Sequence, residues 1–317
     1  MRKPVLVIVA AMVLAACGGN PTSSTTPSPT TLGKVDRIAK EVPSSMQGQT
    51  LHIATDATYE PNEFTDPSTG KISGWDVDFG QALCTVMGMT CQFDNVSFDT
   101  IIAQLKASNS RYQFSLSSWS PTEEREKSGI DFISYYRAGE AFIVKAQGGA
   151  TVNTTADLCG KKVAVESGTT EESDAWAFMG KQVGGSAMAG KTDGCRTAGK
   201  ADITVLSFEK QTEANSALLS GRADAGFLDQ PVAAYQVKKS NGQFKISGQP
   251  CSVAPYGLAL VKGGQLEQAL TDAIKYVIDN GFYKQVLDKY GVADGAIKSS
   301  DVKLNDNNAV GATCVPS

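Results

Sequence analysis

The chain has 317 residues, of which 41% are hydrophobic and 20% are charged, and its net charge is −4. This composition is typical of a folded protein and excludes a disordered or collagen-like chain. The slightly acidic balance excludes a basic surface for nucleic acid, and the single histidine, His52, excludes the usual zinc clusters and Ser/His/Asp triads. Because single hydrophobic cores stop growing at about 250 to 300 residues, we expect two lobes.

The first sixteen residues have the pattern of a bacterial secretion signal. Two basic residues, Arg2 and Lys3, precede an apolar stretch that is too short to span a bilayer. The sequence LAAC that ends at Cys17 matches a lipobox, in which the cysteine becomes the lipidated first residue of the mature protein. We therefore predict a lipoprotein signal peptide at 1–16, lipidation of Cys17, and an extracytoplasmic position on the outer face of the cell membrane. The alternative is an ordinary signal peptide with a chance cysteine.

A flexible tether is predicted for residues 17–47. Between Asn20 and Thr31 the chain is almost wholly Ser, Thr and Pro, with no large apolar side chains to offset the entropy cost of ordering it. Such a tether would let the folded body reorient just outside the membrane.

Six cysteines follow Cys17, an even number that favours three disulfides in an oxidising compartment. Six cysteines allow fifteen pairings, and the alternative of a redox or metal site lacks both CxxC spacing and histidine partners. We expect no metal and no cofactor. Our prediction is that neighbours pair, namely Cys84 with Cys91, Cys159 with Cys195 and Cys251 with Cys314.

Beyond residue 48, short apolar runs alternate with helical stretches, which is the pattern of an α/β protein. Helices are predicted at 75–87, 266–280 and 282–290. The first has large apolar residues at every fourth position, which we expect in the core: Trp75, Phe79, Leu83 and Met87. Gly88 can end this helix. Strands are expected at 51–54, 112–116, 141–145, 162–165, 203–206, 223–228 and 256–261.

A first candidate site follows the strand at 112–116. Ser120 to Glu123 have the signature of a capping box, which predicts that a helix begins there. Free backbone donors, serine hydroxyls and Arg125 would then converge at the carboxyl end of a strand, and the planar guanidinium suits a carboxylate. The alternative is a solvated arginine that pairs with neighbouring acids.

Two further candidates also follow strands. Thr169 and Glu172 form a capping box after the strand at 162–165, and Gly168 would let the backbone approach a ligand closely. A simple helix cap is an equally good interpretation. Asp229 follows the strand at 223–228, where its carboxylate would hold an ammonium group or cap the next helix.

Together these segments resemble the type II extracellular solute-binding proteins (family 3) of bacterial amino-acid ABC importers, in their lipoprotein form. That family includes receptors for histidine, for lysine, arginine and ornithine, and for glutamine. The resemblance implies an α/β clamshell in which two lobes, joined by two crossover hinge strands, close on the ligand. It covers about residues 51–290 through IATDATYEPNEF, GKISGWDVDFGQAL, SFDTIIAQL, SSWSPTEER, VAVESGTTEE, LLSGRADAGFLDQPVAAY and PYGLALVKG.

The resemblance also implies lobe boundaries and residue roles. Lobe 1 would comprise 48–145 and 251–317, and lobe 2 would comprise 146–250, with crossovers near Lys145 and Cys251. Arg125 would bind the α-carboxylate, and Asp229 would bind the α-ammonium. The remaining ligand-binding residues would be Ser118, Ser120, Gly168 and Thr170 beside the carboxylate, Asp56, Tyr59 and Phe98 around the side chain, and Trp119 in the same cleft.

The chain departs from the family pattern in three places. Glu60, Pro61 and Asn62 stand where the family often has two prolines and a phenylalanine, and Gln113 stands where it usually has an aspartate. The Cys-containing insertion at 179–200 is also atypical, and we interpret it as a surface loop tied by a disulfide.

Three acids, Asp56, Glu60 and Glu166, would face the ligand's side chain with no opposing basic residue, so a basic amino acid is favoured over glutamine or another polar one. The expected partners are this amino acid and an ABC permease, and the expected state is a monomer with no enzymatic activity. The alternatives are a secreted dehydratase-like enzyme on the same fold, with Glu166 or Glu60 as proton donor, and a ligand-binding sensor lipoprotein.

Overall fold

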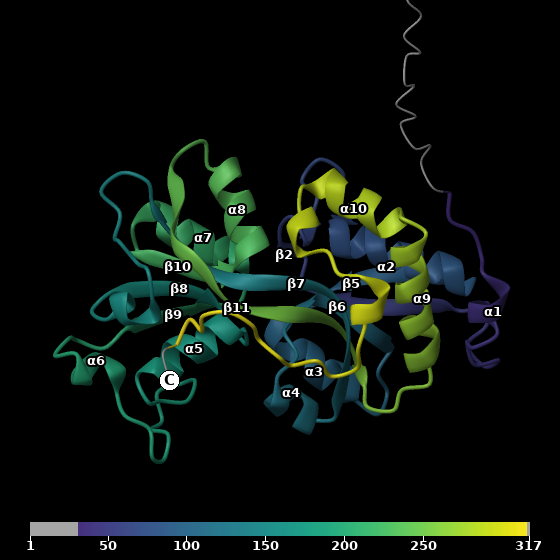
Figure 1. Cartoon of the computed structure of the whole chain (residues 1–317), viewed down its shortest axis with the longest axis horizontal. Helices are drawn as coiled ribbons and strands as arrows, with labels where there is room; N and C mark the ends of the chain where they lie inside the picture. Colours follow the sequence, from purple (N-terminus) through teal and green to yellow (C-terminus); the bar gives the residue numbers. More distant parts are fainter. Residues whose placement is uncertain (1–30, 316–317) are drawn as a thin grey trace, which may run out of the picture.

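The computed structural model describes residues 31–315, so the predicted signal peptide and Cys17 lie outside the described residues. Within this range the chain forms two lobes that share one eight-stranded sheet (Figure 1). No helix in this range is long and apolar enough to cross a membrane. In spatial order the strands are β5 (Thr90–Asn95), β1 (Thr50–Thr55), β6 (Tyr112–Trp119), β11 (Phe244–Val261), β7 (Ile130–Lys145), β10 (Ala225–Asp229), β8 (Lys162–Glu166) and β9 (Thr204–Phe208).

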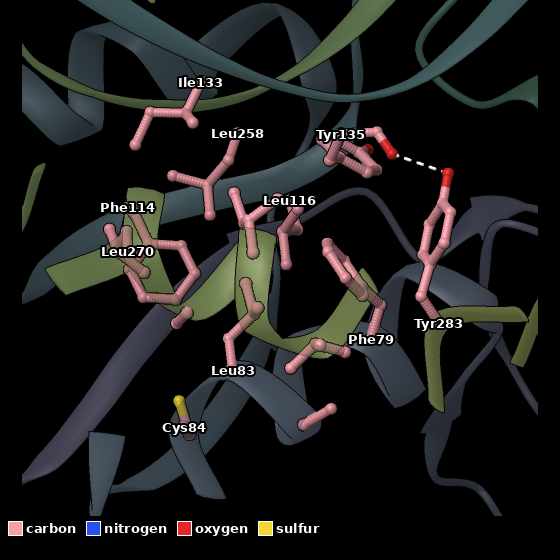
Figure 2. Close-up of a cluster of buried hydrophobic side chains, with 14 of the residues drawn as sticks. Phe79, Leu83, Cys84, Phe114, Leu116, Ile133, Tyr135, Leu258, Leu270 and Tyr283 are labelled. Atoms are coloured by element: carbon pink, nitrogen blue, oxygen red, sulfur yellow. Dashed lines mark hydrogen bonds between the residues drawn. The ribbon is translucent and has the colours of Figure 1, made fainter. Parts of the chain in front are cut away.

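Lobe 1 is built on the parallel strands β5, β1 and β6. Its core lies between the sheet and the helices α2 (Trp75–Met87) and α9 (Glu267–Asp279), which contact each other. Figure 2 shows Leu83 of α2 and Leu270 of α9 beside Phe114 of β6. In the same view the hydroxyl of Tyr283, on α10 (Phe282–Tyr290), donates to the carbonyl oxygen of Tyr135 at 2.8 Å.

The helix predicted at 75–87 is confirmed at its bounds, and the apolar stripe is core. Trp75, Phe79, Leu83 and Met87 are at most 1% exposed. Gly88 follows the helix in the left-handed conformation with φ of 70°, which costs least for glycine.

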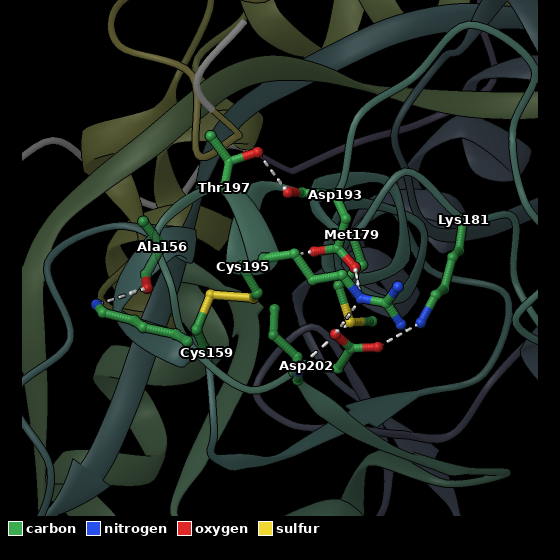
Figure 3. Close-up of a disulfide and its surroundings, with 11 residues drawn as sticks. Ala156, Cys159, Met179, Lys181, Asp193, Cys195, Thr197 and Asp202 are labelled. Carbon is green, nitrogen blue, oxygen red and sulfur yellow. Dashed lines mark hydrogen bonds and ion pairs between the residues drawn. A yellow bond between two sulfur atoms is a disulfide. The ribbon is translucent and has the colours of Figure 1, made fainter.

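Lobe 2 is built on the parallel strands β10, β8 and β9. Helices α5 (Thr170–Phe178), α7 (Gln211–Ser220) and α8 (Gln230–Lys239) pack on this sheet. The predicted insertion loop lies at the edge of the lobe and contains the short helix α6 (Gly194–Thr197). Figure 3 shows the disulfide between Cys159 and Cys195 and, beside it, the ion pair of Lys181 with Asp202 at 2.6 Å.

Two long antiparallel strands, β7 and β11, run through both lobes and form the connections between them. Tyr136 of β7 pairs with Tyr256 of β11 inside the lobe 1 core. Glu140 of β7 pairs with Cys251 of β11 on one side and with Asp229 of β10, in lobe 2, on the other. The crossover on β7 therefore falls between residues 136 and 140. The expectation of a crossover near Lys145, and of lobe 1 extending to 145, is wrong, because buried polar residues interrupt the apolar pattern of β7 and hide its length.

Two further predicted boundaries are corrected by packing. The expected tether at 17–47 is too long, because α1 (Asp36–Ala39) belongs to the folded body and its Ile38, like Val42, is buried in the lobe 1 core. The expected assignment of the whole C-terminal segment to lobe 1 is also wrong. After lobe 1 the tail crosses the connecting strands, and the carbonyl of Cys314 accepts a hydrogen bond from Thr155 of lobe 2 (Figure 1).

The structure pairs the six body cysteines in the expected neighbouring order, the other bridges being Cys84–Cys91 and Cys251–Cys314. Several elements had no predicted counterpart because they are short or polar. They include β5, a three-stranded sheet of β2 (Thr58–Tyr59), β3 (Glu63–Thr65) and β4 (Ile72–Ser73), helix α3 (Phe98–Lys106), and the 3-10 helices Thr155–Leu158, Ala293–Gly295 and Ser299–Asp301, whereas helix α4 (Glu123–Lys127) follows the cap signature predicted at 120–123.

Candidate functional site

A cavity lies between the lobes, at the carboxyl ends of their parallel strands, and the empty space within its mouth and walls, including space open to solvent, is about 310 Å³. This is where open α/β sheets bind ligands. Its walls include two residues, Glu166 and Asp229, that end β8 and β10. The lining residues are Asp56, Tyr59, Glu63, Phe98, Ser117, Ser118, Ser120, Arg125, Glu166, Thr169, Thr170, Glu171 and Asp229.

Direct hydrogen bonds join the lobes around this cavity. Tyr59 donates from lobe 1 to Asp229 Oδ2 of lobe 2 at 3.1 Å. Thr58 donates to Glu166 Oε1 at 3.3 Å, and one guanidinium nitrogen of Arg125, Nη2, donates to the carbonyl of Gly168 at 2.7 Å. The structure is therefore a closed clamshell.

Arg125 is held rigidly in this closed cleft. Its second terminal nitrogen, Nη1, donates to the carbonyl oxygen of Ser120 at 2.7 Å, and its guanidinium carbon lies 4.9 Å from the ring centre of Trp119 and 5.6 Å from that of Phe98. Burial lowers the pKa of Arg125 to about 10, against the opposite effect of Glu171. The side chain remains charged at neutral pH and presents a half-buried cation to an anionic group.

The helix that carries Arg125 begins later than predicted. Ser120 is not its cap: Thr122 is, its hydroxyl accepts from the Arg125 amide at 3.2 Å, and Glu123 pairs with Lys127 instead of reaching back. Proline at position 121 disfavours helical backbone at Ser120, and Thr122 is itself extended, with φ of −130° and ψ of 151°, so the helix starts at Glu123.

The second predicted helix cap is confirmed at Thr169. The Thr169 hydroxyl accepts from the Glu172 amide at 3.2 Å and begins α5, while Glu172 accepts from the Gly168 amide rather than from Thr169. Gly168 has φ of 81° and does not line the cavity. A Cβ there would lie 3.0 Å from the Cα of Asp99, so the glycine permits close approach of lobe 1.

Two serines near the carboxyl end of β6, Ser117 and Ser118, are hydrogen-bonded to an acidic network of lobe 1. Ser118 has a φ of 52°, unusual for a residue with a side chain, and its amide donates to Asp76 Oδ2 at 3.1 Å. The hydroxyl of Ser117 donates to Glu63 at 3.1 Å and accepts from the Asp56 amide at 2.9 Å. The network fixes the cavity floor.

An aromatic wall closes one side of the cavity. Phe98 lines it directly and stacks on Trp119 with ring centres 4.1 Å apart. Trp119 is 2% exposed and stands behind Phe98, so it supports the wall without lining the cavity.

Asp229 is buried in the opposite wall, and burial raises its pKa to about 6. Although it precedes α8, its side chain makes no capping hydrogen bond, which removes the simple-cap interpretation. Its Oδ2 accepts from Tyr59, and its own amide donates to the Tyr59 hydroxyl at 3.0 Å. The carboxylate is thus fixed toward the cavity rather than toward its helix.

Two carboxyl groups, Asp56 and Glu166, lie in the walls as predicted from the sequence. Oδ2 of Asp56 accepts from the Phe98 amide at 2.9 Å, while Oδ1 has no hydrogen-bond partner among the described residues. Burial raises the pKa of Asp56 and raises that of Glu166 well above its ordinary value. Both groups would gain from a cation.

Glu60, the third predicted acid, lies elsewhere. It is not among the cavity-lining residues, and its carboxylate bridges the lobes by accepting from the Tyr235 hydroxyl at 2.8 Å and from Lys239. Glu60 is therefore not positioned to contact the side chain of a ligand in the cavity. Its carboxylate is held by Tyr235 and Lys239 of α8, and the sequence does not show that α8 lies beside Glu60.

Four lining residues were not predicted from the sequence: Glu63, Ser117, Thr169 and Glu171. Glu63 and Glu171 each add a buried carboxyl group to the wall, and Glu171 does so beside Asp229. The only sequence signal of Glu171 is an acid in the first turn of a helix, which helix-dipole effects already explain.

This arrangement, a closed two-lobed α/β clamshell with a half-buried cation and several carboxyls around a cavity, defines a solute-binding protein. The model of the bacterial extracellular solute-binding proteins, family 3, matches residues 51–293, and the chain belongs to that family. It is 30% identical over 264 residues to the arginine-binding protein ArgT of Corynebacterium glutamicum, covering 83% of this chain and 81% of that protein.

Two other similarities support the same assignment. The histidine-binding periplasmic protein of Salmonella typhimurium is 28% identical, with 76% of this chain and 87% of that protein covered. The solved structure of an ancestral arginine-binding protein bound to arginine is 32% identical with a TM-score of 0.65, covering 77% of this chain and 99% of the other. Homologues of the chain are thus amino-acid-binding proteins of ABC importers.

Proposed function

We propose that the protein is a lipid-anchored receptor that captures a basic amino acid, arginine first, and delivers it to an ABC permease. The observation that carries the proposal is the charge of the cavity wall, where one guanidinium faces five carboxyl groups. The acids are Asp56, Glu63, Glu166, Glu171 and Asp229.

The wall has separate places for each charged group of such a ligand. Arg125 offers a fixed cation to the α-carboxylate, with the first amides of α5 nearby, and Asp229 offers a fixed anion to the α-ammonium. A cationic side chain would extend along Phe98 to Asp56 and Glu166. Burying a charged ligand in this way is favourable only where each charge finds a partner, so an acidic ligand would be repelled.

Lobe closure gives the proposal its mechanism. The contacts across the cleft form only when the lobes meet, and a ligand that touches both lobes stabilises the closed state by its extra contacts there. The closed surface is then what a permease would recognise, and the ligand is released unchanged. Names of relatives such as the L-arginine-binding protein of Pseudomonas aeruginosa support arginine as the first candidate.

The test is thermal unfolding of the protein, first unfolded and refolded to remove carried ligand, against the twenty amino acids plus ornithine and citrulline. A ligand at about a hundred times its dissociation constant adds roughly 2.7 kcal/mol, which is about 5 °C for a protein of this size. We expect shifts with arginine, lysine and ornithine. A shift with glutamine alone would overturn the substrate, and no shift at all would overturn amino-acid binding.

Variants connect the shift to the cavity. Arg125→Ala should abolish binding of every amino acid, whereas the matched control Arg222→Ala, an exposed arginine beside Phe208 in lobe 2, should not. Asp56→Asn should weaken arginine more than glutamine, because it removes a charge near the side chain only. Normal arginine binding by both Arg125→Ala and Asp56→Asn would show that the site is wrongly placed.

The membrane anchor is a separate part of the proposal and rests on the sequence around Cys17. In the native host, Cys17→Ala should move the protein from the membrane fraction to the medium. A variant that remains in the membrane fraction would contradict lipidation at this residue.

A further inference from the structure

Glu171 lies in the cavity wall with unused hydrogen-bonding capacity. It is the second residue of α5 and only 2% exposed, and it lines the cavity beside Thr170. The hydroxyl of Thr170 donates to Glu171 Oε2 at 3.3 Å, while Oε1 is buried and accepts from no donor among the described residues. A buried carboxylate oxygen without a donor is costly, which points to a donor that arrives from outside the chain.

The neighbouring Asp229 is already partly occupied. Its Oδ2 accepts from Tyr59, so this carboxylate alone has limited capacity for an incoming ammonium group. An α-ammonium has three N–H donors, and in a buried cavity each needs an acceptor. Glu171, which lines the same cavity as Asp229, supplies the missing acceptor.

The electrostatics around Glu171 also favour the binding of a cation there. Burial, and after it the charge of Asp229, raise the pKa of Glu171 well above its ordinary value. Of the charged groups near the guanidinium of Arg125, Glu171 acts most strongly on its pKa, but a ligand's α-carboxylate would take over that cation. Two further acids interact with Glu171, since the charge of Asp174 also raises its pKa and the charge of Glu171 raises that of Glu140.

We propose that Glu171 is a second acceptor for the α-ammonium of the ligand and therefore a residue that selects α-amino acids over analogues without the amine. This inference rests on the proposed function, because it concerns the same cavity and the same class of ligand. Asp229 at the end of β10 and Glu171 at the start of α5 both accept hydrogen bonds from the ammonium. Both residues belong to lobe 2, so the ammonium would be bound chiefly by that lobe.

A purely structural role for Glu171 makes a different prediction. If it only stabilised the first turn of α5, its neutralisation would weaken all ligands alike, with or without an amine. If it binds the ammonium, the loss appears only for ligands that carry one. A double comparison of ligand and variant separates the two roles.

The experiment measures calorimetric affinities of wild type and Glu171→Gln for arginine and for 5-guanidinopentanoate, which is arginine without its α-amine. The weaker analogue is measured by competition with arginine. We expect arginine to bind roughly 10- to 100-fold more weakly to the variant, the range for one lost charge-assisted hydrogen bond. The analogue should change by less than about twofold. Equal losses for the two ligands, or no loss for arginine, would overturn the inference.

Two further variants keep the result interpretable. Glu171→Asp retains the charge but withdraws it from the cavity, so its arginine affinity should lie between those of wild type and Glu171→Gln. Glu213→Gln, an exposed acid of α7, should change neither ligand. If another amino acid gives the largest thermal shift, that amino acid and its deaminated analogue replace the pair. If wild type binds no amino acid, the proposed function itself fails, which is a distinct result.

Discussion

Tyr59 and Asp229 bind each other twice across the cleft. The Tyr59 hydroxyl donates to Asp229 Oδ2 at 3.1 Å and accepts from the Asp229 amide at 3.0 Å. Tyr59 belongs to the small sheet of lobe 1 and Asp229 ends a central strand of lobe 2, 170 residues away in sequence. The pair therefore orients the carboxylate that we propose binds the ligand's ammonium, and it adds two hydrogen bonds between the lobes through one side chain.

The first prediction concerns this pair. Tyr59→Phe keeps the ring but removes both hydrogen bonds, so closure should lose about 1 kcal/mol or somewhat more, and affinity should fall roughly tenfold for every ligand. Calorimetry against arginine and ornithine measures this. The control is Tyr290→Phe, which removes a hydroxyl bound to Asp78 within lobe 1. Affinity equal to wild type in Tyr59→Phe would contradict a role in closure.

A second prediction follows from the placement of Glu60. Its bridge to Tyr235 and Lys239 joins the lobes outside the cavity. Glu60→Gln should lower affinity severalfold and equally for arginine, lysine and glutamine, leaving their rank order unchanged. Because Lys239 is more than half exposed, the effect should shrink in high salt.

The rank order is the decisive measurement. Glu166→Gln is the matched variant, since Glu166 is an acid inside the cavity. It should weaken basic ligands selectively. If Glu60→Gln instead changed which amino acid binds best, the sequence-based interpretation of Glu60 as a selectivity residue would be restored.

The contrast between these acids shows what the sequence could and could not predict. Arg125 and Asp229 were predictable because each follows an apolar strand, and strand ends of one sheet meet at one edge. The same role was predicted for Glu60 and Glu166 from the sequence, but their roles depend on which residues lie opposite them in the structure. Glu60 meets Tyr235, 175 residues away, and no periodicity in one chain encodes that distance.

Glu171 illustrates the same limit at shorter range. An acid in the first turn of α5 is what the helix dipole favours, so its sequence context gives no reason to expect a ligand. Only the closed arrangement, which buries it beside Asp229, changes that interpretation. The fold was easier because the helix at 75–87 and the alternating strands follow from burial pattern alone, whereas the length of β7 was hidden by Asp131 and Ser134.

The third prediction concerns pH. Among the protein's own groups, burial raises the pKa of Asp229 to about 6. A bound ammonium favours the carboxylate and lowers this pKa, so binding releases a proton wherever Asp229 is protonated beforehand. Affinity for amino acids should therefore rise with pH through about 6, by at most about tenfold per pH unit for each proton released, and Glu171, whose pKa burial raises well above its ordinary value, should extend the rise above 6.

Calorimetry at several pH values, in buffers that differ in ionisation enthalpy, measures both the affinity and the released proton. The analogue 5-guanidinopentanoate is the control, because it has no ammonium and should show a flatter profile. An affinity for arginine that falls as pH rises toward 6 would contradict the assignment of Asp229 to the ammonium.

The last prediction concerns the C-terminal tail. It leaves lobe 1 where the Ser134 amide donates to the carbonyl of Lys303 at 2.9 Å, pairs with β11 through Val310, and ends at the disulfide of Cys314 with Cys251. Converting both cysteines to serine should cost about 2 to 4 kcal/mol of stability. It should also expose the tail to protease, with cleavage sites mapped by mass spectrometry.

The matched control is the double serine variant of Cys159 and Cys195, whose disulfide lies in the insertion loop of lobe 2 (Figure 3). That variant should lose stability yet keep the tail protected, since its bridge does not hold the tail. Equal protection of the tail in both variants would mean that packing alone holds it. Cleavage confined to the tail of the Cys251 and Cys314 variant would show that this disulfide fastens the third link between the lobes.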